Sequence, residues 1–89
     1  MNKKMKPLTA TEKKWLDKLK VVLMECPSKR MSAFTIGDAE LYVYDNGFDE
    51  DIDEMMDKRL ASDFCLAVDK LKCELAVIDM PFYVHSTAG

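Results

Sequence analysis

Residues 34–47 read FTIGDAELYVYDNG, and this stretch decides the fold because its apolar side chains recur at every second position. Phe34 and Ile36 predict one strand, and residues 39–44 predict a second strand that returns beside it. Between them Gly37-Asp38 predicts a tight hairpin turn, since glycine supplies the positive φ that such turns need.

The alternation in the second strand also separates its two faces. Leu41 and Val43 fall on one face, and Glu40, Tyr42 and Tyr44 fall on the other. Asp45-Asn46-Gly47 follows and breaks the strand.

A helix is predicted before the hairpin. Thr9 and Glu12 have the spacing of a capping box, and Pro27 ends the helix because the residue before a proline avoids helical geometry. One apolar stripe runs along it at helical spacing: Trp15, Leu16, Leu19, Val22, Leu23 and Cys26. The lysines lie off that stripe.

Two further helices and a strand are predicted after the hairpin. Residues 49–60 return to helical spacing, with Ile52, Met55, Met56 and Leu60 on one side. We expect Met55 and Met56 to enter the core, and the alternative for them is an adaptable contact surface. Ser62-Asp63 starts another helix that runs to about Lys72. Residues 75–78 indicate a buried strand, and residues 82–84 could continue that edge beyond Pro81.

These elements predict an α+β fold in the order α-β-β-α-α-β, with a small antiparallel sheet and helices packed on one face. Eighty-nine residues suffice for one domain, residues 1–89, and the basic residues 1–7 are expected to form a flexible tail. Three cysteines, an odd number without C-x-x-C spacing, indicate buried thiols in a reducing compartment. With no membrane-spanning stretch and no signal-peptide pattern, we expect a cytoplasmic protein that does not engage a membrane.

Charge is divided sharply along the chain. Nine bases and three acids give residues 1–30 a net charge of +6. Residues 31–57 carry nine acids and no Lys or Arg, and residues 58–89 are neutral, so the chain totals −3. The sequence therefore predicts one positive and one negative surface.

The residues that could support catalysis or metal binding do not form a recognisable site. Asp49, Asp51 and Asp53 begin like an EF-hand loop, but Glu54 stands where that loop needs glycine and Leu60 where it needs glutamate. The spacing of Cys26, Cys65, Cys73 and His85 fits no zinc pattern. His85, the only histidine, lacks a recognisable nucleophile arrangement. We expect no catalytic residue, metal site or cofactor, and hence no enzyme.

The acidic segment is the leading candidate for a binding surface. Fixed carboxylates can imitate a row of DNA phosphates and attract a basic groove, and tyrosines are frequent interface anchors. The expected partner-binding residues are Asp38, Glu40, Tyr42, Tyr44, Asp45, Asp49, Glu50, Asp51, Asp53, Glu54 and Asp57. Two alternatives stay open for these residues: the acids form a solvated face, or Tyr42 and Tyr44 are buried under a helix.

Two other partners are compatible with the charges. Lysines of the tail and first helix could meet nucleic-acid phosphates, although no arginine lies on that helix for base contacts. A homodimer could pair the basic and acidic faces of two copies. The expected partner is nevertheless a protein with a basic nucleic-acid-binding groove.

Three segments are distinctive: PFYVHSTAG at residues 81–89, CPS at residues 26–28 with TIGD at residues 35–38, and ASDF at residues 61–64. Together they resemble a group of short, uncharacterised proteins of tailed phages and prophages of enteric bacteria. The resemblance implies a small accessory protein in a bacterial cytoplasm that acts on host machinery. Inhibition of a host nucleic-acid-handling or defence protein is the function that it implies.

Overall fold

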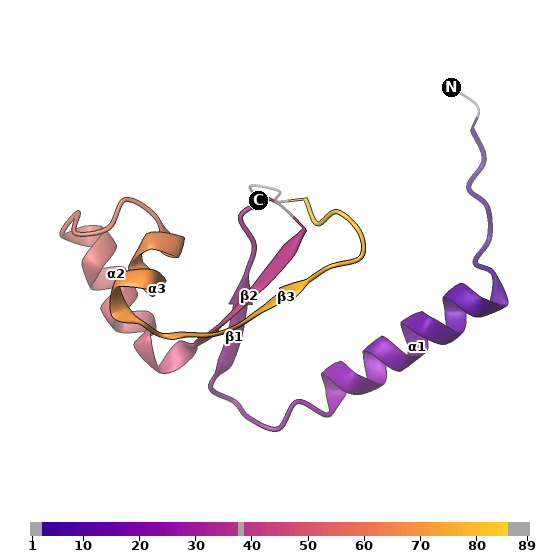
Figure 1. The fold of residues 1–89 in the computed structure, drawn as a ribbon, viewed down its shortest axis with the longest axis horizontal. Coiled ribbons are helices and arrows are strands. Elements are labelled where there is room, and N and C mark those ends of the chain that lie inside the picture. The colour runs from indigo at the N-terminus through magenta and orange to yellow at the C-terminus, as the bar shows by residue number, and fades with distance from the viewer. Residues whose placement is uncertain (1–2, 38, 86–89) are drawn as a thin grey trace.

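The computed structural model describes residues 3–37 and 39–85. In chain order the elements are α1 (Ala10–Met24), β1 (Met31–Phe34), β2 (Glu40–Asp45), the short 3₁₀ helix η1 (Asn46–Phe48), α2 (Asp49–Asp57), α3 (Phe64–Leu71) and β3 (Glu74–Asp79). The α+β class and the order α-β-β-α-α-β are therefore confirmed (Figure 1).

The sheet has three antiparallel strands in the order β1-β2-β3. Phe34 pairs with Tyr42 across β1 and β2, so the connection between these strands is wider than the predicted two-residue turn. Gly37 does have a positive φ of 84°. Thr35 and Ile36 lie outside β1, which begins earlier, at Met31. The predicted position of this strand was wrong because alternation does not mark where a strand ends.

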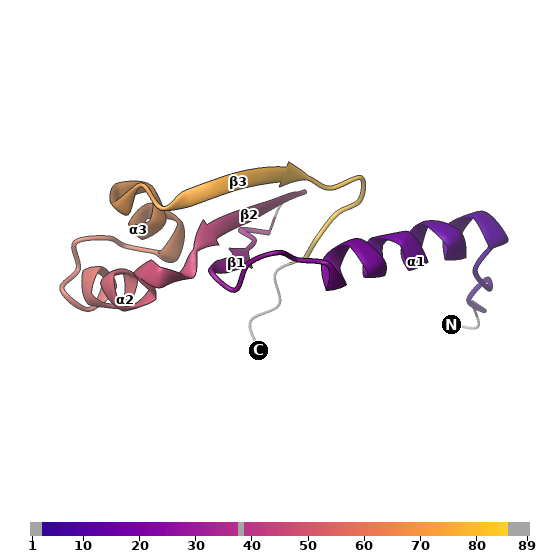
Figure 2. The same ribbon diagram turned by 90° about the horizontal axis from the view of Figure 1, so that it is seen from below.

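Helix α1 begins as predicted and then stands apart from the sheet and from the other helices (Figure 1). The Thr9 hydroxyl accepts from the Glu12 N–H at 3.1 Å, and Glu12 Oε1 accepts from the Thr9 N–H at 2.9 Å. None of its residues is buried. Figures 1 and 2 show α1 beyond one end of the sheet, whereas α2 and α3 lie at the other.

Helix α2 is shorter than predicted. It ends at Asp57, and Arg59 then adopts a left-handed φ of 57°, which turns the chain back. Ile52 is fully buried and Met55 is partly buried, but Met56 and Leu60 are exposed. The expectation that Met56 enters the core was wrong, because the covering elements reach Ile52 and Met55 but not the neighbouring side of the helix that carries Met56.

Helix α3 packs its inner side against α2 and the sheet. Its start at the Asp63 cap and its end beside Lys72 agree with the sequence prediction. The buried core consists of Tyr44, Ile52, Ala61, Ala67, Val68 and Cys73. Phe34 and Phe64 pack against this core. Their rings meet edge-to-face, with centroids 5.1 Å apart.

Strand β3 differs most from expectation. The predicted strand at residues 75–78 is present, but all six residues of β3 are exposed, so the prediction that it is buried was wrong. The reason is that β3 is an edge strand and α2 and α3 cover only one end of the sheet (Figure 2). Residues 82–84 do not form a strand. Instead, the Tyr83 hydroxyl donates a hydrogen bond to the Gly37 carbonyl.

Cysteine burial is mixed: Cys73 is buried, Cys65 is half-buried and Cys26 is exposed. The expectation of buried thiols therefore holds for Cys73 and is wrong for Cys26, which lies just beyond the end of the uncovered helix α1. Within residues 3–37 and 39–85, no helix combines the length and apolar character needed to cross a bilayer.

Because the core is small, its centre should be sensitive to the loss of one methylene group. We expect Ile52→Val to lower the free energy of unfolding by about 0.5–1.5 kcal/mol, since Ile52 is fully enclosed. Met56→Ala, at an exposed position of the same helix, should change it by less than about 0.5 kcal/mol. Urea denaturation followed by circular dichroism measures both values. Equal losses in the two variants would contradict this description of the core.

Candidate protein-interaction surface

The acidic residues of α2 form two neighbouring rows on its outer side. Side chains four positions apart lie on the same side of a helix, so Asp49, Asp53 and Asp57 form one row and Glu50 and Glu54 form the next. All five are exposed, as is Asp51, and α2 contains no Lys or Arg. Neighbouring carboxylates in a row stand about 5–6 Å apart at Cβ.

Few cations neutralise these rows. Lys58 Nζ lies 2.6 Å from Glu54 Oε1, but both side chains are exposed, and such pairs contribute little. Arg30 Nη1 lies 3.2 Å from Asp45 Oδ2. Among the described residues, Glu50, Asp51, Asp53 and Asp57 have no salt bridge. The outer side of α2 therefore carries a concentrated negative charge.

Tyr44 connects these carboxylates to the sheet. Its hydroxyl donates to Asp49 Oδ1 at 2.7 Å, and its ring packs edge-to-face on Phe64 with centroids 5.2 Å apart. Desolvation by burial, reinforced by the hydrogen bond to Asp49, raises the pKa of Tyr44 to about 12. Tyr44 is only 6 % exposed, so it positions Asp49 from beneath and presents no ring to a partner. The alternative in which Tyr44 is buried is therefore the one observed.

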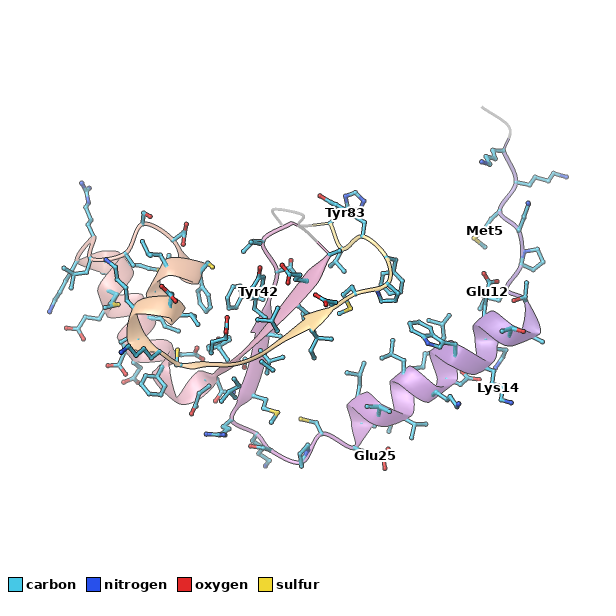
Figure 3. All side chains as sticks on the ribbon, viewed as in Figure 1. Met5, Glu12, Lys14, Glu25, Tyr42 and Tyr83 are labelled. Atoms are coloured by element: carbon cyan, nitrogen blue, oxygen red, sulfur yellow. The ribbon has the colours of Figure 1, made fainter. Side chains whose placement is uncertain are left out.

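Glu40 and Tyr42 lie toward the other end of β2. The Tyr42 hydroxyl donates to Glu40 Oε1 at 3.2 Å, and the Tyr42 ring stacks on Phe34 with centroids 5.2 Å apart. Glu40 and Asp45 are the two ends of this six-residue strand, which separates them by about 17 Å at the usual rise per residue. The predicted acids thus form no single compact patch: Asp45 and the α2 acids gather at one end of β2, and Glu40 stays at the other. Tyr42, labelled in Figure 3, lies on the sheet. Asp38 lies outside the described residues.

The turn from β2 into α2 fixes the direction of the acidic rows. Asp45 Oδ1 accepts from the Gly47 N–H at 2.9 Å and caps η1. The Asn46 side-chain amide donates to the Lys29 carbonyl at 2.9 Å and to Ser32 Oγ at 3.0 Å, which ties this turn to β1. Asn46 was not singled out from the sequence as a positioning residue, although the Asp-Asn-Gly turn was the signal for it.

The groups considered for metal binding or catalysis are not brought together. Within residues 3–37 and 39–85, no three His, Cys, Asp or Glu side chains converge on a position that could hold a metal ion. Burial raises the pKa of the Cys73 thiol, which keeps it protonated and unreactive. His85 packs beside Tyr83, with ring centroids 4.4 Å apart. Comparison with protein-family models, with curated proteins and with solved structures finds no match.

The link between Tyr44 and Asp49 should be visible in the pH dependence of stability. The folded pKa of about 12 exceeds the usual value of 10, so folding favours the neutral phenol. This contribution is complete below pH 10 and is lost as the pH rises toward 12. We expect Tyr44→Phe to remove this loss of stability at high pH. When tyrosinate absorbance is titrated with pH, the signal of the wild type minus that of the variant should have its midpoint near pH 12. A midpoint near 10 would contradict the observed environment.

Proposed function

We propose that this protein is a non-enzymatic interaction protein whose acidic surface binds a basic nucleic-acid-binding groove of another protein. The acidic surface is defined as Asp45 together with the six acids of α2: Asp49, Glu50, Asp51, Asp53, Glu54 and Asp57. The observation that carries this proposal is the regular placement of six exposed carboxylates on one helix with no base among them.

The rigidity of α2 supports this proposal. Ile52 anchors the helix in the core, Tyr44 holds Asp49, and Asp45 caps the preceding turn. Carboxylates that are already fixed lose little freedom when a partner binds, so less binding energy is spent on ordering them. Their like charges repel one another, and a basic partner would relieve that repulsion.

The resemblance to phage and prophage proteins gives the proposal its biological setting. In that setting the partner is a nucleic-acid-handling or defence protein of the bacterial host. The acidic surface would occupy the site where that protein binds nucleic acid and so inhibit it, in the manner of a DNA mimic. Partner and nucleic acid would then compete for one groove.

Charge reversal on α2 tests the surface directly. A partner is first captured from a bacterial lysate with the wild-type protein. We expect the triple variant Glu50→Lys, Asp53→Lys, Asp57→Lys to bind this partner more than about tenfold more weakly, because electrostatically steered association depends on these charges. Asp49 is left intact since it holds Tyr44. Binding of the purified partner is measured by calorimetry at several salt concentrations, and a DNA duplex should displace the protein.

A control with the same change of net charge separates local from global effects. Asp17→Lys, Glu25→Lys and Asp69→Lys replace three exposed acids outside the acidic surface. This control variant should bind within about twofold of wild type, since distant exposed charges are largely screened. If both triple variants lost affinity equally, or neither did, the acidic surface would not be the binding site.

The second candidate function is direct nucleic-acid binding by α1. The observation favouring it is that Lys13, Lys14, Lys18 and Lys20 are all exposed on a helix that stands apart from the sheet. Phosphate contacts alone would give weak binding that falls steeply with salt. The described part of α1 has no arginine to read base edges.

A gel-shift series decides between the two functions. With single- and double-stranded DNA and RNA at low salt, we expect no shift by the wild-type protein, because the negative surface of α2 opposes binding. A shift that is lost when the four α1 lysines become glutamine would establish the second candidate and remove the first.

A further inference from the structure

Helix α1 carries an apolar stripe that its own chain leaves open. Trp15, Leu19, Val22 and Leu23 are between 37 % and 65 % exposed. The ring contact of this stripe is between Trp15 and Phe82, edge-to-face with centroids 6.1 Å apart. A helix of this length has only marginal stability in water when its apolar side is uncovered. We therefore expect the stripe to pack against a partner surface.

The sheet leaves an apolar face open as well. Leu41 pairs with Ile78, and Val43 pairs with Ala76 on one side and Ala33 on the other. These residues lie on the face opposite the aromatic cluster of Phe34, Tyr42 and Tyr44, since side chains alternate along β2. Ile78 is 47 % exposed, and Ala33 and Ala76 are exposed too. We call this the open sheet face.

The chain as a whole exposes more surface than a folded monomer of its mass should. Its accessible area is 7699 Å². A compact protein of 10.2 kDa exposes about 5,300 Å², which leaves an excess of about 2,400 Å² per chain, part of it from the extended residues 3–9. The radius of gyration is 16.8 Å, against about 12 Å for a compact chain of this length. Two copies that recovered most of the excess would bury an area typical of obligate homodimers.

The two open surfaces match in size and in charge. Helix α1 has 15 residues and is about 22 Å long, and the six-residue strands β2 and β3 are about 20 Å long. Helix α1 carries four lysines against two acids. Strands β2 and β3 carry no Lys or Arg and, besides Asp45, three acids: Glu40, Glu74 and Asp79. A basic helix from one copy therefore meets acidic strands in another, without the acids of α2.

We propose that α1 of one copy packs its stripe across the open sheet face of a second copy, and that the second copy does the same in return. The arrangement has two-fold symmetry, so one pair of surfaces is used twice and both are covered. Within a single chain, the contact of Trp15 with Phe82 holds α1 beyond the end of its own sheet (Figure 2). The outer side of α2 takes no part, so the inference is independent of the proposed function.

Helix and sheet variants test the two halves of this contact in the full chain. Wild type should sediment as a dimer at micromolar concentration, and Leu19→Glu with Val22→Glu should sediment as a monomer. Val21→Glu lies off the stripe at a comparable exposure and should stay a dimer. Both helix variants should keep a cooperative urea unfolding transition of the core, because α1 contributes no residue to the core. If wild type were a monomer at every concentration, the proposal would be wrong. The stripe of α1 would then be covered by another partner or by the sheet of its own chain.

The sheet variant distinguishes reciprocal docking from a dimer in which two α1 helices pair with each other. Ile78→Lys, at an exposed edge-strand position, should also sediment as a monomer. Mixing it with the Leu19→Glu, Val22→Glu variant should restore a heterodimer, weaker than wild type, because one intact helix and one intact sheet face then meet. A dimeric Ile78→Lys protein, or a mixture that stays monomeric while both variants remain folded, would overturn the proposal.

Discussion

The rest of the structure depends on Tyr44. Its ring lies against Phe34 and Phe64, which joins β1 and α3 to the central strand, and its hydroxyl holds Asp49 at the start of α2. One side chain thus connects the sheet to both helices that cover it. The exposed carboxylates of α2 point outward because the opposite side of the helix, with Ile52 at its centre, is committed to the core around Tyr44. A mutation that loosened this ring would disturb the fold and the acidic surface together.

This arrangement concentrates the core at one end of a short sheet. Six buried residues, most of them small, enclose little apolar area for a chain of 89 residues. Small domains of this kind bury a lower fraction of their surface and have little stability to spare. The apolar side chains left on α1 and on the open sheet face are numerous enough to form a second layer. In the proposed dimer, a second copy would supply this layer.

The sequence predicted those features that depend on local chemistry. The capping box at Thr9 and Glu12, the Asp63 cap, and the division of β2 into a Leu41 face and a Tyr42 face all appear as expected. It did not predict which apolar faces would be covered. Periodicity shows that Leu75 to Ile78 could lie in a sheet and that Met56 follows Ile52 around a helix, but coverage depends on the number and position of neighbouring elements. Closeness in sequence likewise does not show which acids lie together in space. Glu40 was predicted to join the α2 acids, but the length of β2 separates it from them.

The acidic surface and the apolar stripe respond to salt in opposite ways. Contacts between exposed charges weaken as salt screens them, whereas apolar docking keeps its strength or gains from salting-out ions. The lysines of α1 flank the stripe, so in a dimer they lie at the rim, where they can partly neutralise acids of the neighbouring copy. Dimer formation would leave two α2 helices facing solvent on one particle. A partner with two basic grooves, or one long groove, would then engage both copies at once, which raises avidity without any new contact. On this reasoning, covering the apolar stripe doubles the acidic surface that each particle presents.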